Sequence, residues 1–138
     1  MLSDESFVKS FEDLSLEPHH FNHIGHIRLA WLYLNKYNQA KAIEKVLDGI
    51  YRYANHLGAT DKFNYTLTAA ILKIIAYRVG KKPANTLDEF LASNNDLVSN
   101  MVLVVNKYYS KHILHSDEAK RAFVEPDLKA LPNSLKIF

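Results

Sequence analysis

The stretch that most constrains the fold is residues 17–36, which read Glu-Pro-His-His-Phe-Asn-His-Ile-Gly-His-Ile-Arg-Leu-Ala-Trp-Leu-Tyr-Leu-Asn-Lys. Asn22 is a suitable N-cap, because its side-chain oxygen can accept a hydrogen bond from the unpaired first-turn N–H groups of a helix that starts at His23. Pro18 favours an extended approach to that start. The residues that follow are apolar on nearly every side, which is typical of a helix inside a domain. The stretch therefore predicts a buried central helix at about residues 22–36.

The composition is that of a globular helical protein. The chain has 138 residues, 48% of them hydrophobic and 23% charged, with only four glycines and four prolines. Long runs with helical period predict a single all-α domain over residues 1–138, with five to seven helices. The chain has no cysteine, which excludes disulfides, zinc thiolates and cysteine nucleophiles. Together with the lack of a signal-peptide pattern, this favours the cytoplasm.

Several classes of partner and activity are not indicated. The 17 basic residues nearly balance the 15 acidic ones, and no basic stripe with interleaved aromatic residues appears, so we expect no nucleic-acid partner. No run reaches about 18 apolar residues, so we expect no membrane span. There is no glycine-rich phosphate loop and no nucleophile elbow. Whether the protein is an enzyme is left open by these patterns, as is its oligomeric state.

The other expected helices are marked by their caps and apolar periods. Phe7, Phe11 and Leu14 recur at the spacing of one helix face. Residues 101–105 (Met-Val-Leu-Val-Val) fit either a strand or a buried helix, and we prefer a helix because a lone strand would have no partner. Residues 125–132 are expected to be irregular. Further helix caps are expected at Ser3, Asn38 and Thr86. Thr60 or Asp61 is expected to start a helix that runs to about Gly80, and Ser116 is expected to start one that runs to about Val124.

A pair of histidines lies at the start of the central helix. His23 and His26 fall on one helix face with Ala30 and Tyr33. Their Cβ atoms would be about 6 Å apart, which suits one divalent metal ion if a third ligand joins them. The alternative is that both are buried hydrogen-bonding residues that anchor the helix start, because only some buried ionisable groups belong to functional sites.

A second polar pair interrupts the apolar face of the helix expected over residues 60–80. Asn64 and Thr68 lie one turn apart beside Ile71 and Ile75, while Thr66, Lys73 and Tyr77 are expected on the solvent face. Buried polar groups need partners. If this helix packs beside the central one, Asn64 and Thr68 would share a small polar pocket with the two histidines. The alternative is a hydrogen bond between helices.

Three stretches carry a resemblance to a known family: Phe21-x-His23-x-x-His26-x-Arg28-x-Ala30-Trp31-x-Tyr33-Leu34, Lys62-Phe63-Asn64-Tyr65-Thr66-Leu67-Thr68 and Glu125-Pro126-Asp127-Leu128. In this order they span most of the chain and resemble a family of small uncharacterised bacterial all-helical domains. The resemblance implies that relatives often carry His-Glu where this chain has Asn64-Tyr65. It thus implies that relatives have a histidine-rich polar centre at positions 23, 26, 64 and 65. This chain lacks the two potential metal ligands at positions 64 and 65.

These observations lead to two functional hypotheses. In the first, His23, His26, Asn64 and Thr68 form a small polar pocket that binds a small molecule or a divalent metal ion, with His23 and His26 as metal ligands. In the second, the protein is a non-catalytic structural or protein-interaction module, and its histidines only form hydrogen bonds in the core. No catalytic residue is predicted.

Overall fold

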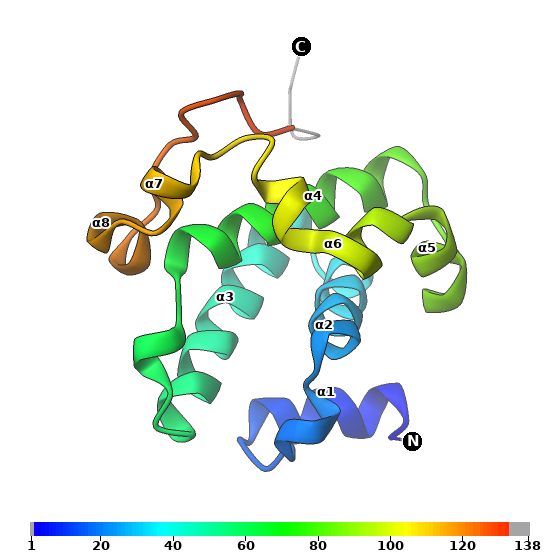
Figure 1. The fold of residues 1–138 in the computed structure, drawn as a ribbon. Coiled ribbons are helices and arrows are strands. Elements are labelled where there is room, and N and C mark those ends of the chain that lie inside the picture. Colours follow the sequence, from blue (N-terminus) through cyan, green and yellow to red (C-terminus); the bar gives the residue numbers. More distant parts are fainter. Residues whose placement is uncertain (1, 133–138) are drawn as a thin grey trace. The chain divides into compact units, whose positions relative to one another are not determined.

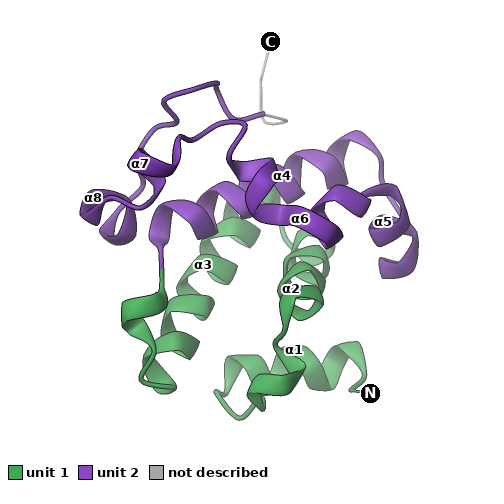
Figure 2. Cartoon of the chain, viewed as in Figure 1, with its two compact units in different colours: residues 1–63 green, residues 64–138 purple. Residues whose placement is uncertain are grey.

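The computed structural model describes residues 2–132, and all regular secondary structure in this range is helical. The all-α class is therefore confirmed. The same range contains eight α-helices and two short 3₁₀ turns, more than the five to seven helices expected. No helix in this part of the chain is long and apolar enough to cross a membrane. The chain divides into two compact units, Met1–Phe63 and Asn64–Phe138 (Figure 2), and the single domain expected over residues 1–138 stays a prediction.

The first unit is built on three α-helices. They are α1 (Asp4–Glu12), α2 (His23–Lys36) and α3 (Gln39–His56), with a 3₁₀ turn before α2 (η1, Pro18–His20) and another after α3 (η2, Thr60–Lys62) (Figure 1). Helix α2 packs along α3, and α1 also contacts α3. The expected central helix is thus present with the expected start at His23 and end at Lys36.

The predicted caps of this unit are confirmed. The side-chain oxygens of Ser3, Asn22 and Asn38 each accept the backbone N–H of the residue three positions later, at 3.1, 2.9 and 2.9 Å. Gly58 follows the end of α3 with a φ of 71°, a left-handed conformation that glycine adopts without steric cost.

The end of α1 differs from the prediction. Leu14 was expected on the apolar face of the first helix, but α1 ends at Glu12 and Leu14 has a φ of 67°. The N–H groups of Ser15 and Leu16 both donate to the Ser10 carbonyl, at 2.8 and 3.0 Å, which turns the chain back at this point. Helices commonly end in this way, with N–H groups from beyond the helix donating to a carbonyl of its last turn.

The core of the first unit contains most of α2 and a cluster of aromatic rings. Trp31 in the middle of α2 is only 8% exposed, in agreement with the predicted burial of this helix. The ring of Phe11 lies 5.4 Å from that of Phe21 and 5.9 Å from that of Tyr53, measured between centroids. The Tyr53 hydroxyl donates to the Leu16 carbonyl at 2.7 Å. These contacts join α1, α3 and the segment before α2.

The second unit contains five α-helices: α4 (Tyr65–Lys81), α5 (Leu87–Ser93), α6 (Asn95–Val105), α7 (Lys111–Leu114) and α8 (Asp117–Arg121). Helix α4 contacts both α6 and α8. Residues 101–105 belong to α6, so the preferred helix is confirmed and the strand alternative is wrong. The cap at Thr86 is also confirmed, because its hydroxyl accepts the Glu89 N–H at 3.2 Å. The short helix α7 has only four residues and was not predicted.

Two helix boundaries and the exposure of one side chain in this unit were predicted wrongly. Helix α4 begins at Tyr65 and not at Thr60 or Asp61, because Asn64 caps it and residues 60–62 form the separate turn η2. Helix α8 ends at Arg121 and not near Val124. Thr66 was expected on the solvent face but is completely buried, where its hydroxyl donates to the Ala122 carbonyl at 2.7 Å and accepts the Val124 N–H at 3.0 Å.

The segment after α8 is irregular, as expected, and is held by hydrogen bonds at several points. The Tyr109 hydroxyl donates to the Val124 carbonyl at 2.6 Å. Asp127 accepts the Ser110 N–H at 2.8 Å, and the Leu128 N–H donates to the Tyr108 carbonyl at 3.0 Å. Burial of the Tyr109 phenol, with the nearby charge of acidic residues in this segment, raises its pKa to about 12.

Candidate functional site

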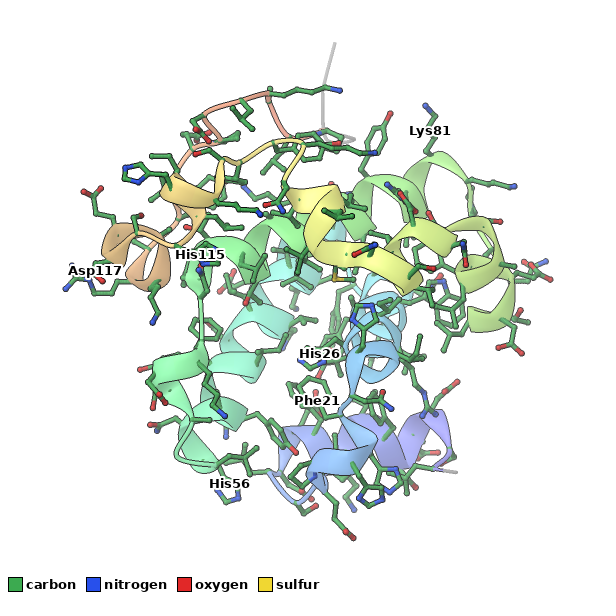
Figure 3. All side chains as sticks on the ribbon, in the orientation of Figure 1. Phe21, His26, His56, Lys81, His115 and Asp117 are labelled. Atoms are coloured by element: carbon green, nitrogen blue, oxygen red, sulfur yellow. The ribbon has the colours of Figure 1, made fainter. Side chains whose placement is uncertain are left out.

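The two predicted histidines share the first turn of α2 but differ in their surroundings. His23 is exposed, so the alternative that both histidines are buried is wrong for this residue. His26 is half-buried and stacks on Phe21, with 3.9 Å between ring centroids (Figure 3). Its Nδ1 lies 2.8 Å from the Asn22 carbonyl oxygen. Because a carbonyl can only accept, Nδ1 carries the proton and Nε2 is the nitrogen available to a ligand in neutral His26.

The position of His26 affects its protonation. Burial is the largest influence and lowers its pKa below the ordinary value. The hydrogen bond to the Asn22 carbonyl favours the charged form and works in the opposite direction, while the charge of His23 lowers the pKa further. His26 is therefore a group that resists protonation while the protein is folded.

Acidification is expected to reduce stability through His26. Its folded pKa lies below the unfolded value of about 6.5. The contribution of neutral His26 to the free energy of unfolding is therefore complete above about pH 6.5, and it is lost as the pH falls towards the folded pKa. His26→Gln should flatten the slope of unfolding free energy against pH in this window. Urea unfolding between about pH 5 and 8 measures the slope, with the exposed His56→Gln as the matched control. Equal slopes for wild type and His26→Gln would contradict the prediction.

The second predicted pair, Asn64 and Thr68, has local partners at the start of α4. The Asn64 side-chain oxygen accepts the Leu67 N–H at 3.0 Å, and its amide nitrogen donates to the Leu114 carbonyl at 2.8 Å. The Thr68 hydroxyl donates to the Asn64 carbonyl at 2.8 Å. Asn64 thus interrupts the apolar pattern because it lies just before the helix. The ligand-binding role of both residues stays a prediction.

The four predicted residues form two pairs, one in each compact unit. His23 and His26 belong to the first unit, and Asn64 and Thr68 belong to the second. Within residues 2–132, no three His, Cys, Asp or Glu side chains gather in a group that could hold a metal ion. A stable site needs more than two protein ligands in most cases. Among the described residues, His23 and His26 therefore have no nearby His, Cys, Asp or Glu arranged to act as a third metal ligand.

A different site in the first unit was not predicted from the sequence. A recess of about 300 Å³ is lined by residues of α1, α2 and α3. Two carboxylates, two cationic side chains and one phenol surround it. Its lining residues are Phe11, Glu12, Tyr33, Lys45, Asp48, Gly49 and Arg52.

Helix α3 contributes four of these residues, at spacings of three and four that bring them to one face. Gly49 is required there, because a Cβ at this position would lie 2.6 Å from Cε2 of Phe11. Phe11 is buried, and its ring packs against Phe21 and Tyr53. An isolated glycine inside a regular helical pattern costs about 1 kcal/mol relative to alanine. Gly49 was thus the sequence signal for this close approach.

One pair of polar groups in the recess is already joined. The Tyr33 hydroxyl donates a hydrogen bond to the Glu12 carboxylate. Burial, followed by this hydrogen bond and the Glu12 charge, raises the pKa of Tyr33 well above its ordinary value. The phenol therefore stays protonated over the whole neutral range and fixes the Glu12 carboxylate at the edge of the recess.

The four charged side chains of the recess do not neutralise one another directly. The ion pairs found within residues 2–132 are Glu17–His19, Asp4–Arg28 and Arg78–Asp96. None of them involves Glu12, Lys45, Asp48 or Arg52. The recess thus presents cationic donors and carboxylate acceptors side by side.

Comparison with known proteins gives no further guide to function. No protein-family model, no curated protein and no solved structure matches this chain. The resemblance of its three sequence stretches to a family of bacterial helical domains therefore stays a prediction.

Proposed function

We propose that the protein is a binding module for a small polar molecule and that the recess of the first unit is its site. The observation that carries this proposal is a hollow of about 300 Å³ lined by charges of both signs that are not paired with one another. This volume is at the lower end of the range for small-molecule sites. The proposal keeps the small ligand expected from the sequence and assigns it to the recess.

Binding fits the groups in the recess better than catalysis does. Tyr33 is protonated and bonded to Glu12, so it is not available as a base. Lys45 and Arg52 can donate hydrogen bonds, and Glu12 and Asp48 can accept them. Such groups hold and orient a ligand. The competing hypothesis, a structural or protein-interaction module, requires no small molecule in the recess.

A panel of small molecules tests the proposal on the full chain. The compounds are glycine, ethanolamine, O-phosphoethanolamine, glycerol, glycerol phosphate and succinate, each at millimolar concentration. Binding is measured from chemical-shift changes of backbone amides in two-dimensional NMR. We expect at least one compound to shift the amides of recess residues on α1 and α3. Zinc is added in a separate titration, and shifts confined to the first turn of α2 would instead favour the predicted metal role of His23 and His26.

A pair of variants shows whether the recess is responsible. Asp48 lines the recess, whereas Glu44 is an exposed residue one turn earlier on α3 that does not line it. Asp48→Trp should fill the recess and weaken binding at least about tenfold, because the ligand loses its space and one acceptor. Glu44→Trp should leave binding unchanged. Absence of recess shifts with every compound, or equal binding by both variants, would overturn the proposal and favour the structural module.

A further inference from the structure

Three lysines surround a single aromatic ring next to the recess. Tyr37 follows the last residue of α2, and its ring lies below the ammonium groups of Lys36, Lys41 and Lys45. The distances from Nζ to the ring centroid are 5.4, 5.3 and 5.1 Å. The ring attracts each cation through its quadrupole. We refer to Lys36, Lys41, Lys45 and Tyr37 as the lysine cluster.

The lysine cluster concentrates positive charge on an exposed surface. All three lysines are exposed, and none takes part in the ion pairs found within residues 2–132. All three ammonium groups lie within 5.4 Å of one ring centroid, so their separations are of the order of the screening length, about 8 Å at physiological salt. Like charges repel one another, and an anion placed among them would relieve this repulsion. The cluster is therefore suited to hold an anionic group.

The lysine cluster and the recess share one residue. Lys45 belongs to both, since it lies over Tyr37 and also lines the recess. Tyr33 also lines the recess, and its ring lies 5.7 Å from the Tyr37 ring between centroids. A molecule in the recess can therefore extend one end to the lysine cluster while the rest of it faces Glu12 and Asp48.

We propose that the ligand of the recess is a small molecule with a phosphate or carboxylate group at one end and hydroxyl or ammonium groups on the rest. Lys36, Lys41 and Lys45 hold the anionic end, and the carboxylates of Glu12 and Asp48 accept hydrogen bonds from the other groups. This inference rests on the proposed function of the recess. A polyanion such as a nucleic acid is disfavoured, because the two recess carboxylates would repel its backbone and the net charge of the chain is only +2.

The test compares three related compounds on the full chain by isothermal titration calorimetry. O-phosphoethanolamine carries a phosphate and an ammonium group, β-alanine a carboxylate and an ammonium group, and ethanolamine no anionic group. We expect ethanolamine to bind at least about tenfold more weakly than the better of the other two, since it lacks the charge-assisted contacts. Raising the salt from about 20 to about 200 mM should weaken binding of the anionic compounds.

Two variants locate the anion site. The double variant Lys36→Gln/Lys41→Gln removes two charges of the lysine cluster and leaves every residue that lines the recess in place. It should weaken binding of the better anionic compound about tenfold or more. The control is Lys73→Gln in the second unit, where Nζ lies 4.0 Å from the ring centroid of Phe123. It removes a lysine from an aromatic ring outside the recess and should leave binding unchanged.

The outcomes separate this inference from the proposed function. Equal affinity of wild type and the double variant, or ethanolamine binding as tightly as both anionic compounds, would overturn the anion site even if Asp48→Trp still abolishes binding. If neither Asp48→Trp nor the double variant Lys36→Gln/Lys41→Gln weakens binding, both proposals are overturned. Preference for O-phosphoethanolamine over β-alanine supports the inference and identifies phosphate as the anionic group, and the reverse preference identifies carboxylate.

Discussion

Replacing Trp31 by alanine is expected to lower the free energy of unfolding by about 3–5 kcal/mol. Trp31 is 8% exposed in the middle of α2, the helix that is apolar on nearly every side. Truncation removes the largest side chain of this helix and leaves a cavity that the helix backbone cannot close. Because Trp31 is the only tryptophan, unfolding of the variant is followed by far-ultraviolet circular dichroism in urea.

The matched control is Trp31→Phe, which keeps most of the ring volume. The indole N–H of Trp31 is buried and has no hydrogen-bond partner among the described residues, so its removal leaves no orphaned acceptor there. The phenylalanine variant should therefore lose only about 1–2 kcal/mol. The wild-type tryptophan should emit at short wavelength and shift to the red on unfolding. Native emission at the wavelength of exposed tryptophan, or equal losses in both variants, would contradict the assigned burial.

Replacing Thr66 by valine is expected to cost about 2–4 kcal/mol although the two side chains have nearly the same shape. Thr66 is completely buried, and its hydroxyl both donates to the Ala122 carbonyl and accepts the Val124 N–H. Valine leaves both backbone groups without this partner, and an unsatisfied polar group costs about 1–3 kcal/mol. Urea unfolding of the full chain, followed by far-ultraviolet circular dichroism, measures the change.

Thr66→Ser separates the hydrogen bonds from packing. Serine keeps the hydroxyl and removes one methyl group, so it should cost only about 1 kcal/mol. A loss from serine as large as that from valine would mean that the methyl group, and not the two hydrogen bonds, stabilises this part of the second unit.

The features that could be predicted from the sequence are those with nearby partners. The caps at Ser3, Asn22 and Asn38 involve residues three positions apart, so their signals are complete within a few letters. The buried helix α2 was likewise predicted by its own apolar residues. The class of the fold follows from such local patterns, because each helix carries its period and its caps within its own residues.

Several of the features that were missed depend on partners far along the chain. Thr66 bonds to a carbonyl 56 residues away, and Asn64 to one 50 residues away, so neither helical period nor capping rules could reveal these contacts. The recess was missed for a related reason. The helical pattern places Lys45, Asp48 and Arg52 on what looks like an ordinary solvent-exposed face. The recess beside them depends on the close approach of Phe11 to Gly49, which the helical pattern does not show.

The cap of α4 has a practical consequence for dividing the protein. The first unit ends at Phe63 and the second begins at Asn64, so no linker residues separate them. A recombinant fragment of the second unit that starts at Tyr65 would lose the acceptor for the Leu67 N–H and the donor to the Leu114 carbonyl together. Expression of that unit by itself should therefore retain Asn64 and place any affinity tag ahead of it.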